Sequence, residues 1–136
     1  MAKAEMNSTK ENRERKEAVE RLQKEVNTDL LWNAIIAFQN YPFFTYSSLP
    51  FSYTIKVGRN GELNKELLIN RRYKSKSLTW SSIVIALDKA LNQKGNVISR
   101  LKEIGDIRGI SYIYPIFYRL GLIDVPEHIA TIMSLQ

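Results

Sequence analysis

The chain has 136 residues, of which 44% are hydrophobic and 25% charged, and its net charge is +6. This length and composition are typical of one globular domain. The absence of cysteine excludes disulfides, thiolate metal sites and cysteine nucleophiles. The apolar runs are too short to span a membrane and the charged N-terminus is unlike a signal peptide, so we expect a cytoplasmic protein.

The first forty residues have the pattern of a long helix. Ser8-x-x-Glu11 is typical of a capping box, which predicts a helix start near Thr9. Apolar residues recur at helical spacing from Ala18 to Ala37, whereas residues 1–17 have no apolar stripe. We therefore expect residues 1–17 to form a solvated helical arm that contributes little to stability, and residues 18–136 to form a single α+β domain.

An aromatic-rich connector follows, because Pro42 disfavours further helix. Its rings could form a platform on which unpaired bases stack, or they could anchor the connector against the core. We favour the second interpretation. The aromatic residues concerned are Tyr41, Phe43, Phe44, Tyr46, Phe51 and Tyr53.

Residues 51–73 predict a β-hairpin. Apolar residues alternate from Phe51 to Val57, and a return strand is predicted over residues 67–73. Asn60-Gly61 between the two segments is a strong hairpin-turn signal. The register of the return strand stays open, because Leu67 and Leu68 are both apolar.

Helical patterns dominate the remaining sequence. Thr79 is a plausible N-cap for a helix that Gly95 ends, and residues 97–104 predict a shorter helical segment. Ser111 is the expected cap of a helix over residues 112–120, and Pro126 begins the last helix. The predicted fold class is α+β, with a long N-terminal helix, one antiparallel β-hairpin and three to four short C-terminal helices.

Positive charge is concentrated on the hairpin and its exit. Residues 41–80 carry seven Lys or Arg against two Glu, whereas residues 1–40 are neutral and residues 81–136 carry +1. A local positive field is typical of a surface that binds a polyanion or an acidic protein. A solvated edge that resists aggregation is the alternative. We expect one exposed binding surface formed by Lys56, Arg59, Lys65, Arg71, Arg72, Lys74 and Lys76.

Signals for catalysis are weak. His128 is the only histidine, and no glycine-rich phosphate-binding motif is present. Four carboxylates could converge on Mg²⁺, but their spacing gives no support for it; they are Asp88, Glu103, Asp106 and Asp124. We therefore predict no enzyme activity, catalytic residue, metal ligand or cofactor.

A helix-turn-helix is a poor fit to residues 97–120. The connector after Gly105 is longer than the usual turn and contains a second glycine, Gly109. The helix that follows is too apolar to lie in a DNA groove. We expect this segment to belong to the core.

Three motifs carry a resemblance to a known family. They are Ile69-Asn-Arg-Arg72, Lys76-Ser-Leu-Thr79 and the segment 109–123, which begins Gly-Ile-Ser-Tyr-Ile-Tyr-Pro. Together with the Trp32-Asn-Ala-Ile35 helix end, they resemble small uncharacterised proteins from bacterial and bacteriophage genomes. The resemblance covers about residues 31–123. It implies no activity, but it favours a role in a mobile element.

The function predicted from the sequence is a non-enzymatic basic protein that contacts nucleic acid through the hairpin. The alternative is a protein-interaction module, such as a phage-encoded inhibitor of the anti-defence or anti-CRISPR type, that targets a host nucleic-acid-processing complex. The partner is thus nucleic acid or an acidic protein surface. DNA or RNA preference and oligomeric state stay open.

Overall fold

Two structural units make up the chain in a computed structural model. The structure describes residues 2–71 and 75–134, and only the backbone of residues 2–8. The first unit is Met1–Gln39 and the second is Asn40–Gln136. In the part described, helices and one antiparallel sheet confirm the α+β class.

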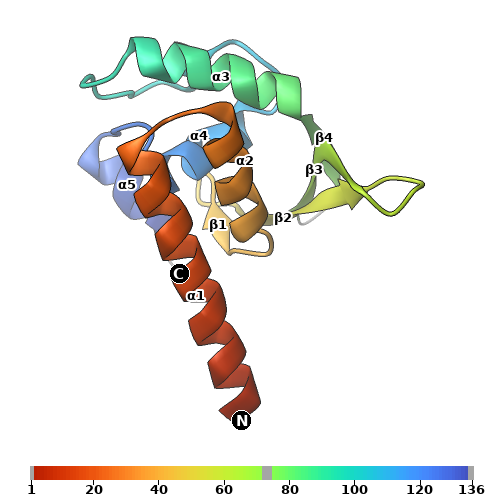
Figure 1. Cartoon of the computed structure of the whole chain (residues 1–136). Coiled ribbons are helices and arrows are strands. Elements are labelled where there is room, and N and C mark those ends of the chain that lie inside the picture. The colour runs from red at the N-terminus through yellow and green to blue at the C-terminus, as the bar shows by residue number, and fades with distance from the viewer. Residues whose placement is uncertain (1, 72–74, 135–136) are drawn as a thin grey trace. The chain divides into compact units, whose positions relative to one another are not determined.

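The first unit is a pair of helices, α1 (Ala2–Lys24) and α2 (Thr28–Ala37), shown in Figure 1. The prediction of one long helix is therefore wrong. Asn27 has an extended backbone, and its side chain accepts a hydrogen bond of 2.8 Å from the backbone N–H of Leu30, which starts α2 as a new helix. The apolar spacing continues through Val26, so helical periodicity alone conceals this break.

Arg15 ties α1 to the end of α2. Its Nε donates to the carbonyl oxygen of Ala37 at 3.0 Å, and its Nη2 donates to that of Gln39 at 3.1 Å. The guanidinium also lies 5.8 Å from the ring centroid of Phe38. A cation at the C-terminus of a helix binds carbonyls that lack a partner within the helix. The expectation that residues 1–17 contribute little to stability stays a prediction, and Arg15 is the residue that puts it most in question. The other residues from 9 to 17 are exposed.

Replacing Arg15 by alanine should lower the free energy of unfolding by about 1.5–2.5 kcal/mol, because hydrogen bonds that involve a charged group are lost. Urea unfolding followed by helical circular dichroism measures the effect. Lys16→Ala is the matched control, because Lys16 is the exposed neighbour on the same helix. Equal effects of the two substitutions would show that the Arg15 contact does not stabilise the protein.

The second unit contains a sheet of strand order β1-β2-β3-β4, with every neighbouring pair antiparallel. The strands are β1 (Phe43–Phe44), β2 (Pro50–Val57), β3 (Leu63–Arg71) and β4 (Lys76–Thr79). The predicted hairpin is present as β2 and β3. Its flanks are also strands, so the expectation of a lone hairpin beside an irregular connector is corrected.

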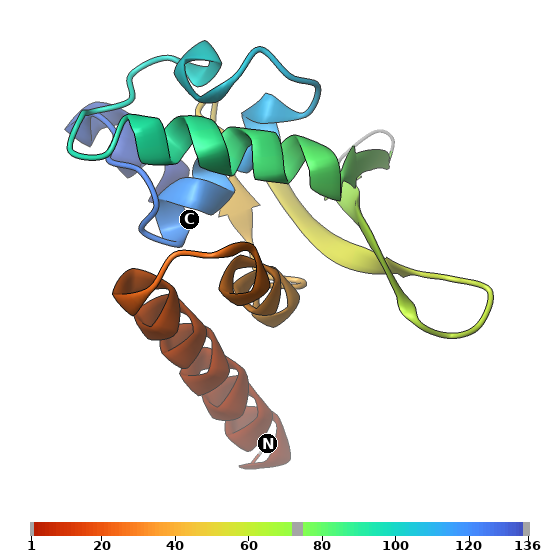
Figure 2. The same ribbon diagram turned by 45° about the horizontal axis from the view of Figure 1, so that its top comes forward.

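The hairpin turn has the chemistry that the sequence predicts. The backbone N–H of Gly58 donates to the carbonyl of Glu62 at 2.7 Å, and Gly61 has a φ of +81°, a conformation that favours glycine. Figures 1 and 2 show this turn projecting away from the helices of the second unit.

The sheet has one buried face. Tyr53 pairs with Ile69 and Ile55 pairs with Leu67, so Leu67 points inward and Leu68 outward. This register resolves the ambiguity of the sequence. The buried residues of the sheet are Phe43, Phe51, Tyr53, Ile55, Leu67, Ile69 and Leu78.

The helical elements of the second unit complete its core. They are α3 (Trp80–Asn92), the 3₁₀ turn η1 (Leu101–Ile104), α4 (Ile110–Arg119) and α5 (Glu127–Ser134). Thr79 is confirmed as the cap of α3, since its hydroxyl accepts from the backbone N–H of Ser82 at 3.4 Å. The predicted cap Ser111 is wrong, because α4 begins after Gly109, whose backbone is left-handed. Within the described residues, no helix is long and apolar enough to cross a membrane.

Candidate nucleic-acid interface

The basic residues predicted to form one surface lie on both faces of the sheet. Lys56 is on the outer face of β2, where its Nζ forms an ion pair of 3.3 Å with Glu66 Oε1. Tyr53 and Ile55, which precede it with the opposite orientation, point into the core. Lys56 is exposed as predicted, but it is paired and does not join Arg71 or Lys76.

Two further cations lie toward the hairpin turn. Arg59 is exposed in the turn itself, and Lys65 Nζ lies 5.4 Å from the ring centroid of Trp80. Since Phe51 pairs with Arg71 at the opposite end of the hairpin, Arg59 lies about 20 Å from Arg71 along the strands. Arg72 and Lys74 lie outside the described residues. The single basic surface predicted from the sequence is therefore not what the described residues form.

Arg71 and Lys76 do come together. Lys76 pairs with Ile69 across β3 and β4, and Arg71 is two residues beyond Ile69 on the same strand. Alternation along a strand therefore places both side chains on the sheet face that also carries Ile69. They are diagonal neighbours at its edge, a placement that brings long side chains within reach of one another.

Tyr112, in the first turn of α4, is the point on which these two cations converge. Arg71 Nη1 donates to the Tyr112 hydroxyl oxygen at 2.7 Å, and Lys76 Nζ lies 5.8 Å from the Tyr112 ring centroid. Phe51 packs against the same ring edge-to-face, with centroids 5.0 Å apart. The buried tyrosine therefore fixes the position of both charges. We call Arg71, Lys76 and Tyr112 the cation–tyrosine cluster.

An open hollow of about 480 Å³ lies at the end of β3 and shares Arg71 with this cluster. By the strand register, its polar side chains belong to the sheet face opposite the one that carries Arg71 and Lys76. Its walls include the half-buried ring of Phe44 and two polar side chains, Ser52 and Asn70, which are paired across β2 and β3. A planar group could contact Phe44 while its edge meets a hydroxyl and an amide. The complete lining is Asn40, Pro42, Phe43, Phe44, Pro50, Phe51, Ser52, Asn70 and Arg71.

The aromatic residues of the connector differ in their surroundings. Phe43 is buried and stacks between Phe51 and Tyr53, with ring centroids 5.3 and 6.0 Å away, so it is a packing anchor as expected. Tyr41 accepts a hydrogen bond of 3.0 Å from Arg119 Nε. Phe44 alone of the connector rings lines the hollow without being fully buried.

The described residues contain no group of three or more histidine or acidic side chains placed to hold a metal ion. His128 is exposed on α5. The carboxylate of Glu103 is engaged by two backbone N–H groups, those of Ser99 and Arg100, at 2.9 and 3.1 Å.

Sequence reasoning missed Tyr112, Phe44, Ser52 and Asn70 as members of the site. Tyr112 lies 41 residues from Arg71 and sits in a segment whose apolar character predicts core. Ser52 and Asn70 could have been found from the strand register, because a polar residue paired with another polar residue marks the outer face of a hairpin.

Searches of protein-family models, curated proteins and solved structures return no match to this chain.

Proposed function

We propose that the protein binds nucleic acid, with a phosphate at the cation–tyrosine cluster and a base in the hollow, which shares Arg71 with the cluster but takes its polar side chains from the other face of the sheet. The observation that carries the proposal is the convergence of Arg71 and Lys76 on one tyrosine. Arg71 Cζ and Lys76 Nζ lie 6.0 and 5.8 Å from the same ring centroid, and a bound anion would relieve the repulsion between these two like charges.

The tyrosine hydroxyl strengthens the case for an anion. Tyr112 accepts a hydrogen bond from Arg71, which leaves its own proton available to a further acceptor. A phosphate oxygen at the cluster would receive hydrogen bonds from a guanidinium, an ammonium and a hydroxyl, which are common phosphate-binding groups.

The hollow supports nucleic acid over an isolated phosphate. Phe44 offers a ring face, which favours stacking with any unpaired base. Ser52 and Asn70 offer donors and acceptors of the kind that contact base edges. A single-stranded or locally opened segment fits this arrangement, because a paired base keeps its faces inside the duplex.

Replacing Arg71 and Lys76 together by glutamine should weaken binding of a fluorescently labelled 20-nucleotide single strand by about tenfold to a hundredfold at low salt. Anisotropy titrations at several salt concentrations should also show a salt slope lower by about 1.4, or about 0.7 per lost phosphate contact on a single strand. The slope falls because the variant neutralises fewer phosphates, so its binding releases fewer counterions from the nucleic acid.

The matched control replaces Lys56 and Lys89, both exposed, by glutamine, which removes the same charge from other surfaces. Much smaller effects are expected from the control. Equal losses in both double variants would mean that only net charge matters, and the site would be wrong. Failure of the native protein to bind single- or double-stranded probes at low salt would reject nucleic-acid binding altogether.

An inhibitor-like protein-interaction module is the second candidate. The hairpin end exposes a cross-strand apolar pair, Val57 and Leu63, which are 60% and 46% exposed, and Leu68 is 38% exposed on the outer face. Exposed apolar side chains that adjoin one another are typical of protein-interaction surfaces. Binding through them would persist at high salt, whereas phosphate binding would not.

A further inference from the structure

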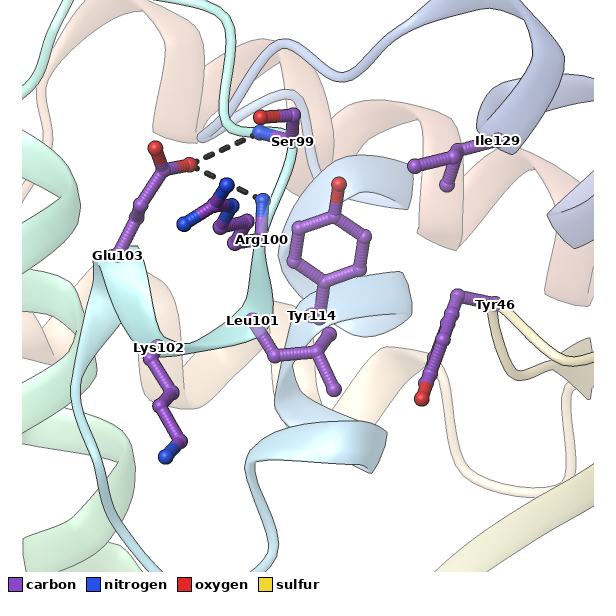
Figure 3. Close-up of a pocket in the computed structure, with 8 residues that line it drawn as sticks. All are labelled: Tyr46, Ser99, Arg100, Leu101, Lys102, Glu103, Tyr114 and Ile129. Carbon is purple, nitrogen blue, oxygen red and sulfur yellow. Dashed lines mark hydrogen bonds between the residues drawn. The ribbon is translucent and has the colours of Figure 1, made fainter.

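A second cavity of about 600 Å³ lies apart from the hollow and shares no lining residue with it. It is formed by the loop after β1, by η1 with the residues before it, and by α4 and α5. Its size is within the range of small-molecule sites. Figure 3 shows the lining residues, which are Tyr46, Ser99, Arg100, Leu101, Lys102, Glu103, Tyr114 and Ile129.

The walls of this cavity are mainly apolar. Tyr114 is buried and its hydroxyl donates to the carbonyl of Ile98, so the tyrosine presents its ring to the cavity. Burial, and then the nearby Glu103 carboxylate, raise the pKa of Tyr114 to about 12, so the phenol stays neutral at ordinary pH. Leu101 and Ile129 supply the remaining apolar surface.

Tyr46 is the exposed aromatic residue of the cavity. It is 45% exposed, so its ring is accessible to a ligand in the cavity. Its loop is held in place by two hydrogen bonds between Thr45 and Leu49, at 2.9 and 3.0 Å. In the same loop Ser48 has a φ of +68°, a conformation that is unfavourable for a residue other than glycine and that often marks functional loops. The loop therefore holds an aromatic ring toward solvent at the cavity.

The charges around the cavity favour an anion. Arg100 and Lys102 are exposed lining residues, against one carboxylate, Glu103. That carboxylate is already stabilised by the backbone N–H groups of Ser99 and Arg100. Figure 3 shows Arg100 and Glu103 on one side of Tyr114, and Tyr46 and Ile129 on the other. The polar and apolar parts of the cavity are thus separated.

We propose that this cavity binds a small planar aromatic molecule with an anionic group. The ring lies against Tyr46, and the anion lies across Tyr114 from it, on the side of Arg100 and Lys102. The anionic group is a phosphate, as in a nucleoside monophosphate, or a carboxylate, as in an aromatic acid. This site is separate from the proposed nucleic-acid site.

Calorimetric titration of the whole chain tests the proposal with four probes. Adenosine 5′-monophosphate and indole-3-carboxylate each carry a ring and an anion, whereas adenosine has only the ring and inorganic phosphate only the anion. At least one of the first two should bind about tenfold more tightly than adenosine or phosphate. Which of the two binds identifies the anionic group. Binding of neither, or equal binding of all four, overturns the proposal.

Variants locate the site. Tyr46→Ala should lower the affinity for the probe that binds by about tenfold, as expected when one stacking contact is lost. Arg100→Gln combined with Lys102→Gln should reduce the affinity to that of adenosine. The charge-matched control, Lys94→Gln with Arg108→Gln, alters two exposed residues that do not line the cavity, and it should bind like the native protein.

The double variant Arg71→Gln, Lys76→Gln separates the two proposals. It should keep its affinity for the small probe, because neither residue lines this cavity. Loss of the small probe in this variant, with retention in Tyr46→Ala, would place the small molecule at the cation–tyrosine cluster and overturn the cavity assignment.

Discussion

Replacing Tyr53 by alanine should lower the free energy of unfolding by about 3–5 kcal/mol, the usual cost of removing a large aromatic side chain from a core. Tyr53 is fully buried at the centre of β2, opposite Ile69. Its ring also stacks against Phe43 at 6.0 Å, so its loss leaves a cavity between β2 and the short strand β1. Urea unfolding followed by tyrosine fluorescence and circular dichroism measures the change.

Two neighbouring substitutions serve as controls for Tyr53→Ala. Thr54→Ala changes the exposed face of the same strand and should shift stability by at most about 0.5 kcal/mol. Tyr53→Phe keeps the ring and removes only the hydroxyl, so we expect a cost of about 1 kcal/mol. If Tyr53→Ala cost no more than Tyr53→Phe, the ring would not be a central element of the core.

Replacing Gly109 by alanine should lower the free energy of unfolding by about 2–5 kcal/mol. The φ of Gly109 is +86°, which is unfavourable for alanine by about 1–2 kcal/mol. A Cβ would also lie 2.5 Å from Cδ1 of Leu78, a buried residue of β4. Relief of that overlap requires movement in a packed core and adds about 1–3 kcal/mol.

Gly61→Ala is the matched control for this prediction. Gly61 has a similar φ of +81°, but nothing lies within 4 Å of a Cβ at that position. Gly61→Ala should therefore lower the free energy of unfolding only by the cost of placing alanine at a positive φ. The difference in the free energy of unfolding between the two variants measures the cost of the overlap with Leu78. Equal losses of stability in both variants would show that the close approach of Gly109 to Leu78 does not constrain the fold.

The same close approach positions the cation–tyrosine cluster. Leu78 lies two residues after Lys76 on β4, and Gly109 lies three residues before Tyr112 at the start of α4. The absence of a side chain at Gly109 lets the start of α4 lie against β4, which brings Tyr112 to Arg71 and Lys76. Gly109 is not a member of the cation–tyrosine cluster, but the cluster could not form with this geometry if residue 109 had a side chain.

Local signals in the sequence predicted much of the second unit. Strict alternation in Phe51–Val57 and the Asn60-Gly61 turn are properties of adjacent residues, so they identify the hairpin without tertiary information. Thr79 is recognisable as a cap for the same reason. Strands as short as β1 and β4, of two and four residues, have too little periodicity to be predicted.

The site was predicted less well, because a cluster of charge in sequence is not a cluster in space. Lys56 and Arg71 are both basic and both on the hairpin, but alternation and register place them on opposite faces. Arg71 and Lys76 were predicted to lie on one surface and do converge, whereas the residue on which they converge, Tyr112, is 41 residues from Arg71 in the chain. That long-range pairing has no local signal.

The lengths of the outer strands affect how the protein behaves at high concentration. An unpaired strand edge invites a second molecule to extend the sheet, which is a route to aggregation. Here β1 offers only two residues, and Pro42 stands immediately before it. On the other side, β4 has four residues and passes directly into α3. Because β1 pairs only with Pro50 and Phe51, the rest of β2 as far as Val57 has no strand neighbour on that side among the described residues. The exposed Lys56 in this stretch is a charge of the kind that discourages another strand from pairing there.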